Sequence, residues 1–313
     1  MCGGNLYYHV NTIRFVDGTL LLEEAGAHLE LIGRWCVWDE RVRALRAKAS
    51  DYAPILRALH GKVAYDDRAQ RYQTLAVTET VPLDMRPYQQ QALAAWLAAQ
   101  RRGVVVLPTG AGKTYVAVRA ICAAQRSTLV LVPTIDLVHQ WADDLARRLG
   151  EPIGRYGGGE KDLRAITIST YDSGILFMPH HGDRFGLLIC DECHHLPAEV
   201  TSQAAEACLA PFRLGLTATP ERLDGGHERL TELLGPEVHR SHIGDLEGEF
   251  LANYQVEVIE VPLDADETEA YHANREIYLR FVRSRGINFS QPDAWQRFIA
   301  ESARDPDGRA VMT

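Results

Sequence analysis

The feature that most constrains this chain is the octapeptide LPTGAGKT, Leu107 to Thr114, which follows an apolar run and precedes a helical pattern. Gly110 and Gly112 allow backbone N–H groups to turn inward around a phosphate, and the N-terminus of the following helix attracts the same anion. The Lys113 ammonium can reach the β- and γ-phosphates of a nucleotide, and the Thr114 hydroxyl can ligate Mg²⁺. The general pattern opens with Gly where Leu107 stands. A glycine-rich turn with an incidental lysine is the alternative, but the chain has only four lysines and one of them falls at the required position.

Short apolar runs alternate with helical stretches around this loop. The runs occupy residues 103–107, 127–132, 165–169, 186–190 and 212–216, and helical patterns fill residues 89–100 and 115–125. Such runs suit strands buried on both faces, and their alternation with helices is typical of a parallel sheet. The predicted fold class is therefore α/β: a parallel-sheet lobe that carries the phosphate loop, with a small N-terminal α+β domain and a C-terminal helical extension.

An acidic pair, Asp191 and Glu192, directly follows the apolar run LLIC. A buried strand delivers such residues at its carboxyl end, where α/β sheets bind ligands. Asp191 can hold Mg²⁺, and Glu192 can orient and deprotonate an attacking water. A helix N-terminus with favourable acids is the alternative, but at about 80 residues after a phosphate loop the catalytic interpretation is favoured.

Two further segments carry polar groups next to the apolar runs. Thr217-Ala218-Thr219 closes one run, so its hydroxyls could touch both the acidic pair and a γ-phosphate, although a polar strand end explains them equally well. Gln89 precedes the first run, and its amide could pair with an adenine edge because it donates and accepts at once.

The six cysteines are scattered, which fits a reducing cytosol better than a disulfide framework. Cys190 and Cys193 form a C-x-x-C around the acidic pair. Zinc would need a second pair of ligands, and none is obvious in the sequence. We interpret both cysteines as strand and turn residues.

Composition narrows the class of protein further. The 313 residues carry a net charge of −9, which argues against a protein that coats nucleic acid by charge alone but allows a local basic groove. No run approaches the ~18 apolar residues of a membrane helix, and the start shows no secretory pattern. We expect a cytoplasmic protein with more than one domain.

The two ends of the chain differ from the central part. Asp17-Gly18, between apolar runs at 12–16 and 19–22, is a strong hairpin signal. Residues 41–60 carry apolar side chains at helical spacing, interrupted by Pro54. A helix is also predicted over residues 266–285.

The motif order RPYQ, LPTGAGKT, LVPT, STYDS, DECHH, LTATP resembles the first motor lobe of superfamily 2 helicases. The segments STYDS, RFGLLICDECHHLPAE and APFRLGLTATPERLDG resemble the corresponding segments of the XPB branch, whose members are double-stranded DNA translocases of repair and transcription. The resemblance is strong over residues 82–262. It implies a damage-recognition-like domain at 1–80, a RecA-like lobe at 81–262 and the start of a thumb-like helical extension at 263–313, with ATP and Mg²⁺ as cofactors and double-stranded DNA as partner.

The resemblance also implies roles for individual residues. The nucleotide would be held by Arg86, Gln89, Thr109, Gly110, Ala111, Gly112, Lys113 and Thr114. Hydrolysis would depend on Lys113, Asp191 and Glu192, with Mg²⁺ held by Thr114 and Asp191. Coupling to DNA would involve His195, Thr217, Ala218 and Thr219. The DNA backbone would meet Pro133, Thr134, Ser169, Thr170, Arg222 and Asp224, where hydroxyls and helix N-termini bind phosphate without net positive charge. Family members often have Glu between the last two, where this chain has Leu223.

The predicted helix at 266–285 supports a second DNA hypothesis. Arg275, Arg280 and Arg283 could grip a backbone while Tyr278 and Phe281 stack or wedge at a duplex end. An amphipathic helix that packs its aromatic side chains and leaves its arginines solvated fits the sequence equally well.

The length of the chain bears on the expected activity. In the resembled motors ATP binds between two lobes, and arginines of the second are worth ~10³ to 10⁵ in rate. A second lobe needs on the order of 100–150 residues, which do not fit after Thr219. We therefore expect the N-terminal half of a longer motor, which binds ATP but hydrolyses little.

Three alternatives stay open. The motor subunit of a restriction-modification system shares these motifs, and a nuclease or methyltransferase partner would distinguish it from a repair protein. An ATP-gated DNA-damage-binding module would engage distorted duplex without turnover. An RNA remodelling enzyme ranks last, because such enzymes usually show Asp-Glu-Ala-Asp where this chain has Asp191-Glu192-Cys193-His194.

Overall fold

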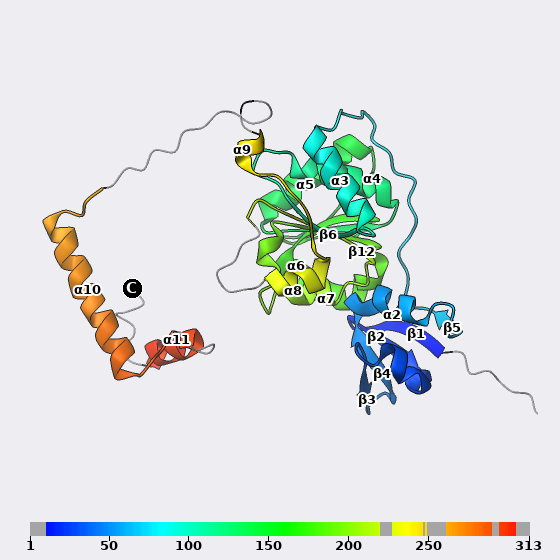
Figure 1. Ribbon diagram of the computed structural model, residues 1–313, viewed down its shortest axis with the longest axis horizontal. Coiled ribbons are helices and arrows are strands. Elements are labelled where there is room, and N and C mark those ends of the chain that lie inside the picture. Colours follow the sequence, from blue (N-terminus) through cyan, green and yellow to red (C-terminus); the bar gives the residue numbers. More distant parts are fainter. Residues whose placement is uncertain (1–10, 220–226, 247, 249–260, 290–293, 305–313) are drawn as a thin grey trace, which may run out of the picture. The chain divides into compact units, whose positions relative to one another are not determined.

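The computed structural model describes residues 11–219, 227–246, 248, 261–289 and 294–304. The chain divides into two compact units, residues 1–253 and 254–313 (Figure 1).

The first unit begins with a five-stranded sheet of order β3-β4-β2-β1-β5. Its elements are β1 Asn11–Val16, β2 Thr19–Glu23, α1 Leu29–Ile32, β3 Val37–Asp39, β4 Ala44–Lys48, α2 Tyr52–Leu59 and β5 Tyr65–Asp67. Asp17 and Gly18 both take positive φ, 48° and 76°, between the antiparallel β1 and β2. This is the geometry of a two-residue hairpin turn, so that prediction is confirmed.

The helix predicted over residues 41–60 is wrong in its first half. Residues 44–48 form β4 instead, because they pair in register with β2. Pro54 does not interrupt the helix that follows, since it lies in the first turn of α2, where the backbone N–H has no partner within the helix.

An eight-stranded sheet of order β13-β6-β12-β11-β7-β10-β8-β9 forms the rest of this unit, and only β8 and β9 pair antiparallel. Its strands are β6 Arg102–Val106, β7 Thr128–Val132, β8 Gly154–Gly157, β9 Glu160–Lys161, β10 Ile166–Thr170, β11 Leu187–Asp191, β12 Phe212–Thr217 and β13 Glu237–Arg240. Its helices are α3 Pro87–Ala98, α4 Lys113–Ala124, α5 Ile135–Leu149, α6 Tyr171–His181, α7 Ser202–Glu206, α8 His227–Leu234 and α9 Ile243–Leu246. The parallel sheet predicted from the five apolar runs is confirmed.

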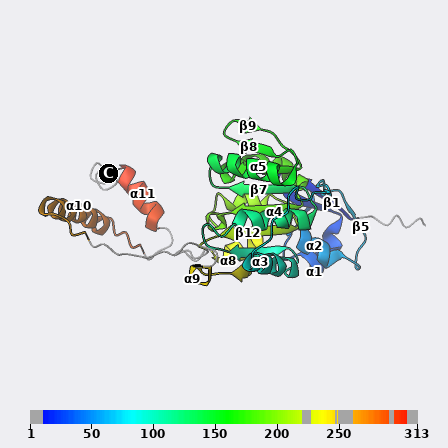
Figure 2. The ribbon, with the colours of Figure 1, turned by 90° about the horizontal axis from the view of Figure 1, so that it is seen from above.

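Helices cover both faces of this sheet (Figures 1 and 2). Val105 and Leu107 contribute to one core layer with residues of α3, α4 and α5. Val104 and Val106 contribute to the other, with residues of α6, α7 and α8. Alternate side chains of residues 104–107 therefore enter opposite layers, which is why all four of these residues are apolar.

The small sheet packs against the larger one within the same unit. Leu209, which precedes β12, is fully buried in the core of the small sheet. The Arg71 guanidinium donates two hydrogen bonds to the buried carboxylate of Asp183, and Lys48 pairs with Glu206 of α7.

The second unit contains α10 Ala265–Ser284 and α11 Ala294–Arg304. The Asp264 side chain accepts from the N–H of Glu267, whose carboxylate accepts from the N–H of Asp264, so a capping box starts α10. The helix predicted at 266–285 is confirmed. Across the described ranges no helix combines the length and the apolar character that a bilayer crossing requires.

Candidate active site

The phosphate-loop sequence and the two polar strand ends come together at one edge of the large sheet. The loop follows β6, Thr217 ends β12 and Asp191 ends β11. These three strands are direct neighbours in parallel register. Because the carboxyl ends of parallel strands meet at one edge, segments far apart in the sequence form one site.

The loop has the backbone that its glycines allow. Gly110 and Gly112 take φ of 80° and 79°, and α4 begins at Lys113. Thr109 and Gly110 are exposed, whereas Ala111 is buried. A Cβ on Gly112 would lie 2.6 Å from the Gln89 Nε2 atom, so this position requires glycine for its contact as well as its φ.

The Gln89 side chain is buried and bonds main-chain atoms of the phosphate loop and of the start of α3. Its Nε2 donates to the Ala111 carbonyl at 2.9 Å, and its Oε1 accepts from the Arg86 N–H at 3.0 Å. Tyr88 adds a bond from its hydroxyl to the same Ala111 carbonyl at 2.9 Å. In this structure the Gln89 amide is used by the main chain, and adenine recognition by Arg86 and Gln89 stays a prediction.

Lys113 lies between the loop and the acidic pair. Its Nζ atom is 3.4 Å from the Leu107 carbonyl oxygen and 3.6 Å from the Glu192 Oε1 atom. Glu192 takes a positive φ of 45°, which is uncommon for a residue with a side chain and concentrates at functional sites. An ammonium, a helix N-terminus and two carboxylates at one glycine-rich turn fit a nucleotide phosphate with Mg²⁺.

Asp191 is buried, and each of its carboxylate oxygens has a donor. Trp141 of α5 donates its indole N–H to Oδ2 at 3.0 Å, and the Glu192 N–H donates to Oδ1 at 3.1 Å. Burial raises the pKa of Asp191, the Glu192 carboxylate raises it further, and the bond from Trp141 works against both. Trp141 was not predicted as a site residue, because at helical spacing it has the pattern of a core residue.

His194 adds a side-chain contact between the acidic segment and β12. Its Nδ1 lies 3.0 Å from the Thr217 Oγ1 and 3.5 Å from the Glu192 Oε2. His195, which the sequence analysis selected for coupling, is exposed, and its ring centroid lies 4.2 Å from that of His194. Thr217 is buried and bonds the Thr219 N–H, whereas Ala218 is half-buried and Thr219 is exposed.

The residues predicted to meet DNA follow the next two strands of the sheet. Pro133 and Thr134 follow β7, and the exposed Thr134 caps α5. Thr170 ends β10 and caps α6 by accepting from the Ser173 N–H at 3.2 Å. Ser169 is corrected: its side chain is fully buried, with its hydroxyl on the Thr170 carbonyl, so it does not present a hydroxyl to DNA.

The glycine turn at 157–159 lies beside both of these helix N-termini, which the sequence analysis missed. A Cβ on Gly157 would lie 3.2 Å from the Ser173 hydroxyl, and one on Gly158 would lie 3.0 Å from Ile135. These residues occupy the first turns of α6 and α5. The three consecutive glycines were the one sequence feature that could have pointed to this turn.

The remaining DNA candidates lie elsewhere. Arg222 and Asp224 fall outside the described residues. Arg275, Arg280 and Arg283 are exposed on α10. Phe281 is corrected: it is buried, and its ring packs on Phe298 of α11, so it does not stack on a duplex end. Tyr278 also packs on Phe298.

The cysteines of the C-x-x-C lie in the core layer that α6, α7 and α8 cover. Burial raises the pKa of the Cys190 thiol to about 12, and it raises that of Cys193 strongly. Among the described residues no cluster of three His, Cys, Asp or Glu could hold a metal ion.

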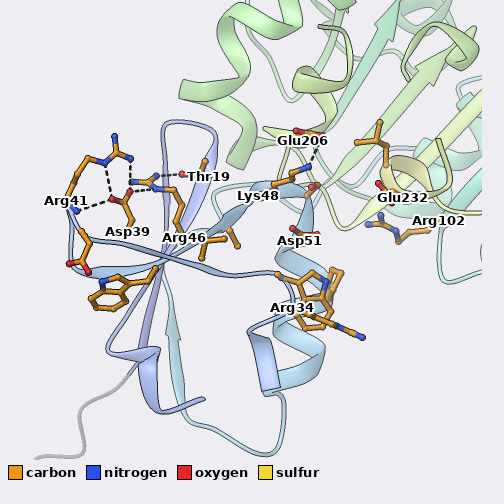
Figure 3. Close-up of a pocket in the computed structure, with 18 residues that line it drawn as sticks. Thr19, Arg34, Asp39, Arg41, Arg46, Lys48, Asp51, Arg102, Glu206 and Glu232 are labelled. Atoms are coloured by element: carbon orange, nitrogen blue, oxygen red, sulfur yellow. Dashed lines mark hydrogen bonds and ion pairs between the residues drawn. The ribbon is translucent and has the colours of Figure 1, made fainter. Parts of the chain in front are cut away.

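A pocket of about 1030 Å³ lies away from this site, between the small sheet and the amino end of β6 (Figure 3). Arg102 of β6 lines it opposite Asp39 and Arg41 of the small sheet.

The fold and the site together define a RecA-like phosphate-loop lobe. Residues 13–69 match the family model of the xeroderma pigmentosum group B helicase damage recognition domain. Residues 82–222 match that of the type III restriction enzyme, res subunit. The DNA 3'-5' translocase XPB2 of Sulfurisphaera tokodaii is 41% identical over 96% of this chain and 66% of its own length. The chain belongs to the XPB family of superfamily 2 helicases.

Other relatives are longer than the matched region. The putative DNA 3'-5' helicase Rad25 of Halobacterium salinarum is 37% identical over 82% of this chain, which spans 45% of it. The chain therefore spans from under half to about two thirds of the length of these relatives. Among solved structures, the Pyrococcus furiosus Hef helicase domain is 21% identical with a TM-score of 0.45, over 72% of this chain and 55% of that one.

Proposed function

We propose that this chain provides the nucleotide-binding lobe and the small N-terminal domain of an ATP-dependent double-stranded DNA translocase that acts in DNA repair. The observation that supports this most directly is the 3.6 Å approach of Lys113 to Glu192, because it joins the phosphate loop to the acidic pair in one site. The relatives named as DNA translocase and helicase support DNA as the substrate.

Each side chain of the site has a separate task. Lys113 and the N–H groups of residues 110–114 bind the phosphates, and Asp191 and Thr114 provide oxygen ligands for Mg²⁺. Glu192 orients a water and takes its proton. When bound, Mg²⁺ would neutralise charge that develops on the phosphates. His194 connects this chemistry to β12 through Thr217.

The DNA contact in this proposal uses helix N-termini. α5 and α6 begin beside each other after the neighbouring strands β7 and β10, and their caps are Thr134 and Thr170. N–H groups at such ends bind phosphate without lysine or arginine, which is compatible with a net charge of −9.

Substitution of Thr134 tests this contact. Thr134→Glu places a negative charge where a phosphate would lie, so we expect affinity for a 20-base-pair duplex to fall about tenfold at physiological salt. Gln140→Glu is the matched control, because Gln140 is exposed on the same helix about 9 Å further along its axis. Equal affinities of the two variants would overturn the DNA assignment.

The exposed arginines of α10 are a second candidate contact with DNA. Replacing Arg275, Arg280 and Arg283 by Ala should reduce the salt slope of duplex binding by about 2.7 if all three meet phosphates. An unchanged slope would assign α10 to packing alone.

Location and partners complete the proposal. We propose a cytoplasmic protein, which the free thiols of Cys36, Cys122, Cys190, Cys193 and Cys208 support. Repair proteins or a nuclease are the proposed protein partners. A restriction motor is less supported, because the match at residues 13–69 is to the XPB domain.

A further inference from the structure

Trp141 connects α5 to the acidic pair. It is 3% exposed, and its indole N–H donates to the Asp191 Oδ2 at 3.0 Å. α5 covers the same face of the sheet as α4, so the indole reaches Asp191 from within the core layer (Figure 1).

The bond from Trp141 is one of two described hydrogen bonds that orient the Asp191 carboxylate. The described contacts of Asp191 comprise one donor for each oxygen, Trp141 on Oδ2 and the Glu192 N–H on Oδ1. Each carboxylate oxygen carries two lone pairs, so one site on each stays open for a metal ion or its water. Without the indole, only a main-chain N–H on the neighbouring residue would hold the carboxylate.

A comparison within the lobe shows what is specific to Trp141. Trp96 of α3 is also fully buried, and its indole N–H donates to the Arg213 carbonyl at 2.9 Å. Both tryptophans therefore satisfy the same buried donor and fill a similar volume of core. Only Trp141 bonds a side chain that the nucleotide site uses.

We propose that Trp141 is a positioning residue for the Mg²⁺ site, and that it acts by holding the Asp191 carboxylate toward the phosphate loop. This rests on the proposed function, in which Asp191 is a metal ligand. Loss of such an outer hydrogen bond typically costs 10–100-fold in metal affinity. Because Thr134 caps α5, the proposed DNA contact and this positioning residue belong to one helix.

The test compares Trp141→Phe with Trp96→Phe in the full chain. Binding of a fluorescent ADP analogue is measured in EDTA and then over a Mg²⁺ titration. We expect unchanged affinity in EDTA for both variants. The Mg²⁺ concentration for half-maximal effect should rise about tenfold in Trp141→Phe and less than twofold in Trp96→Phe. Equal shifts in the two variants would overturn the proposal.

A second substitution separates the N–H from the packing. Replacing Trp141 by 3-benzothienylalanine keeps the ring shape and removes only the donor. The same tenfold shift supports the proposal, and wild-type behaviour overturns it. A different result would show that the proposed function itself is wrong. In that case wild type and Lys113→Ala would bind the ADP analogue with equal affinity, and the role of Trp141 would be refuted as well.

Discussion

The Lys113 ammonium and the Glu192 carboxylate lie 3.6 Å apart, although they belong to different motifs, one after β6 and one after β11. β12 lies between these two strands, so the approach depends on the loop after β6 and on the positive φ of Glu192. A bound phosphate would compete with Glu192 for the ammonium. The contact thus links the occupancy of the loop to the position of the proposed base.

Glu192→Gln should separate nucleotide binding from hydrolysis. The amide keeps the shape but neither accepts a proton nor forms an ion pair with Lys113. The two side chains are 11% (Lys113) and 30% (Glu192) exposed, and losing their pairing should cost on the order of 1 kcal/mol. We expect nucleotide affinity of this chain within about fivefold of wild type, and hydrolysis by a motor that carries both lobes reduced by about 10² or more. Phosphate release with duplex DNA measures this, with Glu199→Gln as the exposed control. Undiminished hydrolysis would remove Glu192 from the mechanism.

His194→Ala and His195→Ala should differ in coupling. Of these two histidines, His194 is the one that contacts both Thr217 and Glu192 in the described part of the chain, so its loss removes a side-chain contact between the acidic segment and β12. We expect duplex DNA to change nucleotide affinity in wild type and in His195→Ala by the same factor, and to change it less in His194→Ala. Nucleotide titrations with and without duplex measure the factor. A larger loss in His195→Ala would contradict this expectation and support the assignment of coupling to His195.

Replacing Arg213 or Arg102 by Met should change the free energy of unfolding in opposite directions. The fully buried Arg213 guanidinium donates to the carbonyls of Ala205, Cys208, Ala210 and Leu233. Losing it leaves buried acceptors unpaired, so we expect at least about 3 kcal/mol of destabilisation.

Arg102 is the second arginine of this comparison. Its Nη1 atom is buried without a hydrogen-bond partner among the described residues. Burial lowers its pKa to about 9, and nearby Arg213 and Arg57 add to the effect. The charge is therefore unfavourable in the folded state, and Arg102→Met should raise the free energy of unfolding by about 1 kcal/mol. Urea unfolding of both variants measures the difference, and destabilisation by Arg102→Met would contradict this account.

The buried thiols should be unreactive in the folded protein at pH 8. The thiolate is the reactive form, and burial raises the pKa of Cys190 to about 12 and also raises that of Cys208. The folded state thus holds these protons more tightly than the unfolded state, and reactivity should appear only on unfolding. Labelling a Cys2→Ser variant, with the half-buried Cys122 as reference, checks this by peptide mass. Labelling of Cys190 as fast as Cys122 would contradict it.

The sequence predicted the five strands β6, β7, β10, β11 and β12 because each is a largely apolar run bounded by turn residues. It failed at residues 44–48, where pairing with β2 overrides helical spacing. β13 was also missed, because Glu237–Arg240 is polar and joins the sheet only through its pairing with β6.

The candidate site was predictable where a motif fixes the residue type and its spacing. Lys113, Asp191 and Glu192 were selected in this way, and the structure places Lys113 3.6 Å from Glu192. The bond from Trp141 to Asp191 was not, because a tryptophan at helical spacing does not show which polar atom its N–H will meet. His194 and His195 are adjacent, and only the turn after β11 determines which ring reaches Thr217.

The central claim is that Lys113 belongs to a nucleotide phosphate site. Calorimetric titration of the full chain with Mg-ATP, beside the same titration of Lys113→Ala, tests it most directly. We predict saturable one-to-one binding for the wild type and at least about a hundredfold weaker binding for the variant, since a charge-assisted contact with phosphate is worth about 3 kcal/mol. Identical affinities of the two proteins would contradict the account.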